Sequence, residues 1–130
     1  MIVVEGKVVP ACGDFKRRMT NFPEAFRRAT GEELFKGTLN VDVGREIAIR
    51  EEFRILGTEI NEPTQDLQFE RCAINDIPAF RIRPYVIATG EGGHGDHILE
   101  ISCGREIPNA GYGCVVRVTL FRDDVELGGE

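Results

Sequence analysis

The sequence predicts a mainly β protein, folded as a small closed barrel of six strands with one short helix. Two observations lead to this fold class. Short segments that alternate apolar and polar residues, or are rich in β-branched residues, recur along the 130 residues with turn signals between them. The chain also holds 15 glycines and six prolines, and only one segment has a clear helical pattern. Its apolar content of 42% suffices for a core without disulfides or metals.

The expected strands are separated by residues that end or turn a chain. Pro10 ends the first strand, and Asn75-Asp76 form a turn between the third and the fourth. Pro84 interrupts the fourth strand, which therefore lies at a sheet edge or bends there. Residues 45–53 fit either a strand or the first turn of a helix. The strands are expected at residues 2–9, 38–43, 67–74, 79–88, 97–103 and 114–121.

The expected helix covers residues 21–30. Asn21 is a favourable N-cap, Pro23 lies in the first turn, and Glu24 falls three residues after the cap, as in a capping box. Gly31 is suited to end the helix. A helix of about two turns depends on tertiary packing for its stability.

The composition predicts a single cytoplasmic domain of residues 1–122, followed by a frayed acidic tail at residues 123–130. The net charge of -6 argues against a sequence-independent nucleic-acid binder, which needs a basic surface. No apolar run approaches the length of a membrane span, and the charged residues near the N-terminus do not fit a signal peptide. None of the four cysteines has CxxC spacing, so they are expected to be reduced thiols. We expect a monomer that binds neither nucleic acid nor membrane.

A glycine-rich segment precedes the fifth expected strand. Gly90, Gly92 and Gly95 spell GxGxxG, but a dinucleotide fingerprint must open a helix, and residues 97–101 alternate like a strand. A loop that covers a ligand and a simple glycine-rich hairpin both fit the pattern. His94 and His97 lie in the same region, but no carboxylate or cysteine completes a metal shell, so loop histidines are the preferred interpretation.

Thr38 and Asn40 are two residues apart on an expected strand, so their side chains point to the same face. Both offer neutral oxygens, which Mg²⁺ accepts alongside waters and phosphate oxygens. Ordinary hydrogen bonding within a turn or sheet explains the pair equally well.

Residues 11–19 are expected to form a short basic loop. Its run Lys16-Arg17-Arg18 is suited to hold a polyphosphate. A solvated charged loop is the commoner reason for such a run.

Glu100 is a carboxylate within an apolar strand, residues 98–101. Two interpretations remain open. It lies on the outer face, or it accepts a hydrogen bond from a ligand's hydroxyl or ring N–H.

Several motifs of the chain occur together in a known family. They are Val4-Glu5-Gly6-Lys7-Val8-Val9, Phe35-Lys36-Gly37-Thr38-Leu39-Asn40-Val41, Arg83-Pro84, His94, Ile98-Leu99-Glu100-Ile101, and the closing stretch 105–116 with Gly113. In this order they resemble the archaeal CTP-dependent riboflavin kinases. The resemblance spans nearly the whole chain and rests mainly on Gly-Thr-Leu-Asn and on the segment from His94 to Glu100.

The resemblance implies a cradle-loop barrel with a defined set of site residues. Thr38 and Asn40 would hold Mg²⁺. The flavin would contact Glu100 and the loop that carries Gly92 and His94, where Gly92 replaces an expected threonine. The residues implied for the nucleotide are Cys12, Gly13, Asp14, Lys16, Arg105 and Glu106.

The implied activity is transfer of the terminal phosphoryl group of CTP to the 5′-hydroxyl of riboflavin, giving FMN and CDP. One departure bears on this activity. The nucleotide loop of the family has several glycines, whereas residues 10–15 keep only Gly13. A relative that binds flavin or nucleotide without phosphoryl transfer is therefore the alternative. A barrel that serves as an interaction module or associates with DNA is a third hypothesis, which the acidic charge and the absence of a helix-turn-helix pattern disfavour.

Overall fold

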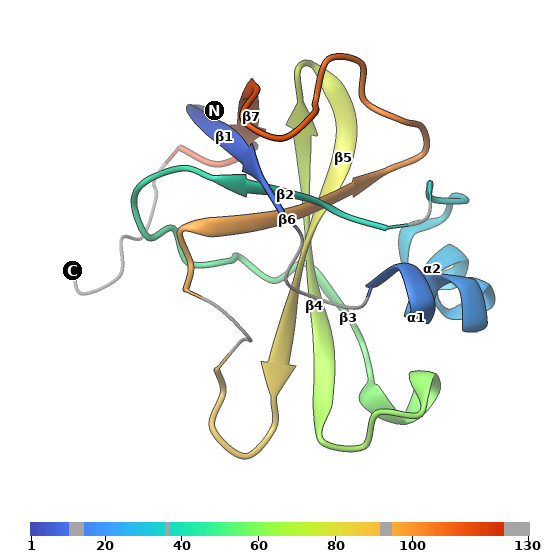
Figure 1. Cartoon of the computed structure of the whole chain (residues 1–130). Coiled ribbons are helices and arrows are strands. Elements are labelled where there is room, and N and C mark those ends of the chain that lie inside the picture. Colours follow the sequence, from blue (N-terminus) through green and yellow to red (C-terminus); the bar gives the residue numbers. More distant parts are fainter. Residues whose placement is uncertain (11–14, 36, 92–94, 124–130) are drawn as a thin grey trace.

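The computed structural model describes residues 1–10, 15–35, 37–91 and 95–123. These residues form seven strands, two short α-helices and one turn of 3₁₀ helix (Figure 1). The elements are β1 (Ile2–Val9), α1 (Phe15–Asn21), α2 (Pro23–Thr30), β2 (Leu39–Asp42), β3 (Phe53–Ile55), η1 (Gly57–Ile60), β4 (Gln65–Ile74), β5 (Ile77–Val86), β6 (Ile98–Cys103) and β7 (Val115–Leu120).

Six of the strands close into an antiparallel barrel. The sheet runs β3-β4-β5-β6-β2-β1-β7, and a further pairing of β4 with β7 joins its ends. One edge of β4 pairs with β5 along its whole length. The other edge is shared, because residues 67–69 pair with β3 and residues 72–74 pair with β7. The expected closed barrel of six strands is therefore confirmed, with β3 as an additional short strand outside the closure.

The expected strand boundaries agree with the structure to within a few residues. β5 continues through Pro84, which pairs with Leu67 of β4. The β5–β6 ladder ends at Ile82, so the missing N–H of Pro84 lies where β5 has no partner on its second edge. Asn75 and Asp76 form the expected tight turn, and both have positive φ angles.

The expectation of a single helix beginning at Asn21 is wrong. Residues 15–21 form α1, although residues 11–19 were expected as a loop, because Phe15 and Met19 lie one turn apart and are both buried. Asn21 is the last residue of α1, and Phe22 occupies the N-cap position of α2 without a side-chain cap. Gly31 ends α2 in the left-handed conformation, as expected, and its N–H donates to the carbonyl of Arg27 at 2.8 Å.

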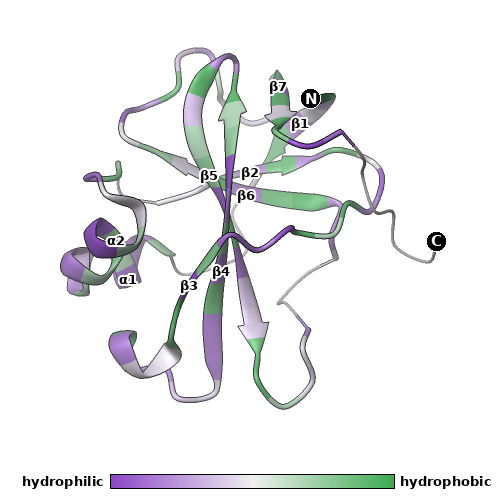
Figure 2. Cartoon of the chain, turned by 180° about the vertical axis from the view of Figure 1, so that it is seen from behind, coloured by the Kyte–Doolittle hydropathy of each residue, from purple (hydrophilic) through white to green (hydrophobic). Residues whose placement is uncertain are grey.

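The strands and helices enclose two hydrophobic clusters. The first fills the barrel and consists mainly of aliphatic residues from its strands, including Val41, Ile74 and Leu99. The second lies between the helices and the outer face of β3, β4 and β5, and includes Phe26 and Phe69. Apolar residues accordingly concentrate in the strands, whereas the helices carry much of the hydrophilic surface (Figure 2). Successive side chains of β4 and β5 point alternately into the first and the second cluster, so both faces of these strands are covered.

Three charged side chains are buried together on the barrel side of the sheet. Arg81 is 1% exposed and Glu70 3%. Glu70 Oε2 lies 3.3 Å from Arg122 Nε, and its Oε1 lies 3.9 Å from Arg81 Nη1. Burial lowers the pKa of Arg81 to about 10 and raises the pKa of Glu70 above its usual range. Glu70 is thus the nearest counter-ion for two buried guanidinium groups.

This cluster also holds a loop in place. Arg122 Nη2 donates to the carbonyl of Ala48 at 2.8 Å, and the backbone N–H of Arg50 donates to Glu70 Oε1 at 3.1 Å. Residues 48–50, for which the sequence allowed a strand or a helix, are neither and are held by these side chains. No helix within the described ranges is long and apolar enough to cross a membrane.

Replacing Glu70 tests how much this cluster contributes to the stability of the fold. Glu70→Gln should lower the free energy of unfolding by about 3–5 kcal/mol, because it leaves two buried cations without their counter-ion. Urea denaturation at pH 7 measures the change. Glu52→Gln is the control, since Glu52 pairs with exposed Arg71 at the surface, where such a pair contributes at most about 1 kcal/mol. Equal effects of the two substitutions would contradict this role of Glu70.

Candidate functional site

Three of the polar side chains implied in binding lie together, one directly before β2, one on β2 and one on β6. The Oγ1 of Thr38 donates a hydrogen bond to Oδ1 of Asn40 at 3.2 Å. Asn40 in turn is the register partner of Glu100 on β6. Side chains of such cross-strand partners share a face, with Cβ atoms roughly 4.5–5.5 Å apart. The structure therefore brings Thr38, Asn40 and Glu100 to one place.

The face that they share is the outer face of the barrel. Val41 and Leu99, which alternate with Asn40 and Glu100, point into the barrel core. Ile82 of β5, the next residue in the row after Glu100, belongs to the cluster beneath the helices. Asn40 and Glu100 are each only 2% exposed. The site thus adjoins the helix-covered part of the sheet and is shielded from solvent.

Gly37 connects this face to helix α1. Its φ angle of +103° lies in a region that side-chain-bearing residues rarely adopt, which explains a glycine directly before Thr38. Its N–H donates to Sδ of Met19 at 3.2 Å. A Cβ placed on Gly37 would lie 3.9 Å from Cβ of Lys16. The exposed Lys16 is consequently a near neighbour of Gly37, which directly precedes Thr38.

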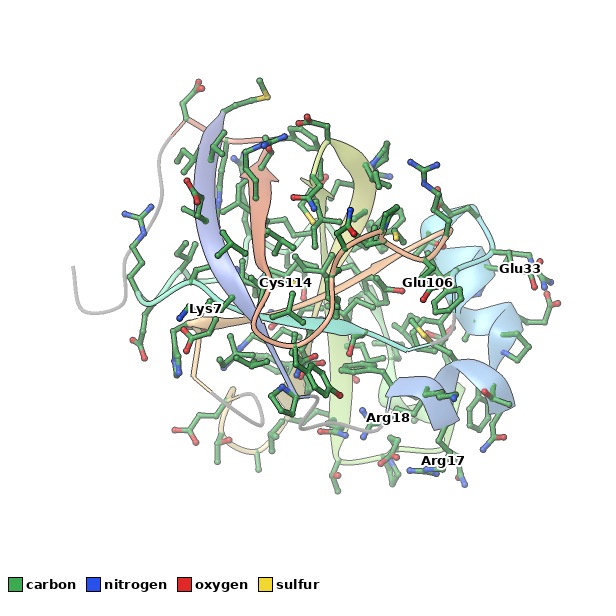
Figure 3. The ribbon with its side chains drawn as sticks, turned by 45° about the horizontal axis from the view of Figure 1, so that its top comes forward. Lys7, Arg17, Arg18, Glu33, Glu106 and Cys114 are labelled. Carbon is green, nitrogen blue, oxygen red and sulfur yellow. The ribbon has the colours of Figure 1, made fainter. Side chains whose placement is uncertain are left out.

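A pocket of about 200 Å³ opens at Thr38. Its walls come from the segment that leads into β2 and from the end of β6 with the loop that follows. Arg105 and Glu106 line it together with Thr38 and Ser102. In Figure 3, Glu106 lies at the end of β6 that is closer to the helices. A residue implied for the metal and two implied for the nucleotide therefore share one cavity.

Two of the basic residues of α1 share one carboxylate. Arg17 Nη2 lies 3.8 Å and Arg18 Nε 3.5 Å from Oε1 of Glu62. Both side chains extend from α1 in Figure 3. Within the described part of the chain, Lys16 takes part in no ion pair, so the run keeps a net positive charge.

Five implied site residues lie outside the described residues. They are Cys12, Gly13, Asp14, Gly92 and His94. Among the residues that are described, no group of three His, Cys, Asp or Glu side chains is placed to hold a metal ion. Thr38 and Asn40 do not belong to such a group, because their side chains offer neutral oxygens in place of charged or nitrogen and sulfur ligands.

The spacing of these two oxygens suits Mg²⁺. Neighbouring ligands of an octahedral Mg²⁺ with bonds of about 2.05 Å are roughly 2.9 Å apart. The observed 3.2 Å between Thr38 Oγ1 and Asn40 Oδ1 is close to that distance. The pair can therefore supply two adjacent positions of the shell, and phosphate oxygens and waters the others.

Sequence reasoning missed part of the pocket wall. Phe35, Ser102 and Ile107 line the cavity, and none of them was singled out. Phe35 was noted only as the aromatic residue of the Gly-Thr-Leu-Asn motif. Its exposed ring, and the approach of residues 101–107 to it, depend on tertiary structure that no local pattern encodes.

A scan of the chain against models of known protein families gives no match. A search of curated proteins gives no match either. Function must consequently be inferred from the motifs and from the geometry of this face.

Proposed function

We propose that the chain is a phosphotransferase that moves the terminal phosphoryl group of CTP to the 5′-hydroxyl of riboflavin, giving FMN and CDP. The observation that carries this proposal is the convergence of Thr38, Asn40 and Glu100 beside a pocket lined by Arg105 and Glu106. Residues suited to a metal, a polar ligand group and an anion thus lie close together, with Asn40 and Glu100 buried.

The residues present fit the magnesium ion that such a reaction needs. Thr38 and Asn40 would hold it through their side-chain oxygens. When bound, the ion neutralises charge on the phosphates as the phosphoryl group moves.

Two of the chain's own cations lie near Thr38. Arg105 lines the pocket, and Lys16 lies next to Gly37. Phosphoryl transfer depends on positioning and charge neutralisation more than on covalent chemistry by the protein. A nucleotide whose base occupies the pocket would extend its phosphates past Thr38 toward Lys16.

Glu100 provides the acceptor for the second substrate. A buried carboxylate forms strong hydrogen bonds to hydroxyl or ring N–H donors, because the surrounding dielectric is low. Its position beside Asn40 would bring a flavin bound to it close to the metal ligands. We assign no general base.

One observation favours the alternative, a relative that binds without catalysis. β1 ends at Val9 and α1 begins at Phe15, whose side chain is anchored in the cluster beneath the helices. Five residues remain between the two elements, and Gly13 is the only glycine among them. Fewer glycines reduce the ability of backbone N–H groups to wrap a polyphosphate.

A coupled assay decides between the two. Purified protein is incubated with riboflavin, Mg²⁺ and either CTP or ATP, and FMN is separated from riboflavin by chromatography. FMN formed with CTP supports the kinase. Riboflavin binding without FMN from either donor supports the non-catalytic relative.

Removing one metal ligand tests the magnesium assignment. Thr38→Val deletes the hydroxyl and keeps the side-chain shape, so turnover should fall at least roughly tenfold while the fold is retained. Initial rates over a Mg²⁺ titration and a thermal melt measure the two effects. Thr58→Val, at an exposed position of η1, should leave both unchanged. If Thr38→Val leaves turnover and its dependence on Mg²⁺ unaltered, Thr38 is not a magnesium ligand.

Glu100→Gln tests the flavin contact. Replacing a charged acceptor by a neutral one should weaken riboflavin binding by roughly tenfold or more, with a smaller effect on CTP. Fluorescence titration of riboflavin and calorimetric titration of CTP give the two dissociation constants. An equal loss of both ligands would indicate a folding defect in place of a lost contact.

A further inference from the structure

Arg81 is buried inside the barrel with donor atoms that no described residue satisfies. The side chain is 1% exposed, and its Nη1 and Nη2 atoms make no hydrogen bond within the described part of the chain. Among the described residues, the one carboxylate within 4 Å is that of Glu70, whose Oε1 lies 3.9 Å from Nη1. That distance is too long for a hydrogen bond. A buried charged donor without an acceptor is strongly destabilising, so an acceptor is expected beside Arg81.

Glu70 cannot be that acceptor, because other groups already use its oxygens. Its Oε1 accepts the backbone N–H of Arg50 at 3.1 Å, and its Oε2 lies 3.3 Å from Arg122 Nε. Arg122 is itself 7% exposed, and its Nε also makes no hydrogen bond to a described residue. One carboxylate thus faces two buried guanidinium groups and leaves donors of both unsatisfied.

The charges of this cluster do not balance. Arg81, Arg122 and Glu70 together carry one positive charge in excess. Two further charged groups influence Arg81, but Arg83 and Asp96 form an ion pair with each other at 3.0 Å and add no net charge. Burial lowers the pKa of Arg81 only to about 10, so its guanidinium stays protonated at neutral pH. Among the described residues, the barrel interior therefore holds an excess positive charge.

A less buried arginine of the same chain shows the usual arrangement. The side chain of Arg54 is 30% exposed, and it donates to two carboxylates, Glu51 at 2.7 Å and Asp66 at 3.0 Å. Arg81 has lost nearly all contact with solvent, yet it donates to no carboxylate among the described residues. Since the need for a counter-ion grows with burial, the arrangement at Arg81 indicates an acceptor that the chain itself does not supply.

We propose that Arg81 and Arg122 bind a small inorganic anion of the halide class inside the barrel, as a second counter-ion next to Glu70. A guanidinium group is a strong donor to anions and offers several N–H groups in one plane. A monovalent anion loses less hydration free energy on burial than a divalent phosphate or sulfate, which favours a halide in an interior lined by aliphatic residues.

The proposed anion site is separate from the candidate site on the outer face. The register partner of Arg81 on β6 is Ile101, which points into the barrel core, whereas the neighbouring Glu100 points to the opposite face. Arg122 also donates to the carbonyl of Ala48 at 2.8 Å, so an anion here would help to hold residues 48–50 against the barrel. The inference does not depend on the proposed function.

The dependence of stability on anions tests the proposal. Thermal melts of the full chain are recorded at pH 7 and constant ionic strength while sodium gluconate is replaced stepwise by sodium chloride or bromide. An anion that binds only the folded chain should raise the unfolding midpoint by roughly 2 °C or more, with saturation. Arg81→Met should lose this dependence. The control Arg71→Met should keep it, because Arg71 is exposed and pairs with Glu52 at the surface.

A crystal structure of the wild-type chain in bromide gives a second readout, which holds even if Arg81→Met does not fold. An anomalous bromide peak in contact with Arg81 Nη1 or Nη2 would support the site. A water at that position without an anomalous signal would overturn it, as would equal chloride shifts in the wild-type chain and in Arg81→Met. Neither measurement involves riboflavin or a nucleotide, so a chain that forms no FMN could still pass both.

Discussion

β4 divides one of its edges between two partners, and this division determines how the sheet closes. Residues 67–69 pair with β3 and residues 72–74 with β7, while β5 covers the whole opposite edge. Closure of the barrel determines which side chains point inward. Successive side chains of a strand point to opposite faces, so burying one face decides the direction of them all. The outer face of β4 and β5 is then available for α1 and α2. The two clusters, and the position of the site at the boundary of the helix-covered face, follow from this closure.

Period-two alternation and turn residues made the strands predictable, because those signals are local. The first helix was not predictable, since its three consecutive basic residues dominate the segment and only Phe15 and Met19 reveal an apolar side. Seven residues are too few to form a stable helix alone, so tertiary packing decides the conformation. The same holds for residues 48–50, whose position is set by the distant side chains of Glu70 and Arg122.

The candidate site shows the same division between local and long-range information. That Thr38 and Asn40 share a face follows from their spacing and is confirmed by their hydrogen bond. That Glu100 lies opposite Asn40 depends on the register of β2 against β6, which no single segment encodes. The pocket was even less predictable from the sequence, because Phe35 and Arg105 come from segments that meet only in the folded chain.

The burial of Asn40 and Glu100 bears on both functional hypotheses. Placing an amide and a carboxylate on neighbouring strands, each 2% exposed, is costly unless their hydrogen bonds are made, and aliphatic residues at the same positions would avoid that cost. Both side chains do have partners in the folded chain, so their burial fits a structural role as well as ligand binding. Binding is common to the kinase and to its non-catalytic relative, so this face alone does not separate them. The two hypotheses differ in how the phosphates of a bound nucleotide would be held, which concerns Arg105 in the pocket, Lys16 near Gly37 and the glycine-poor β1–α1 connection.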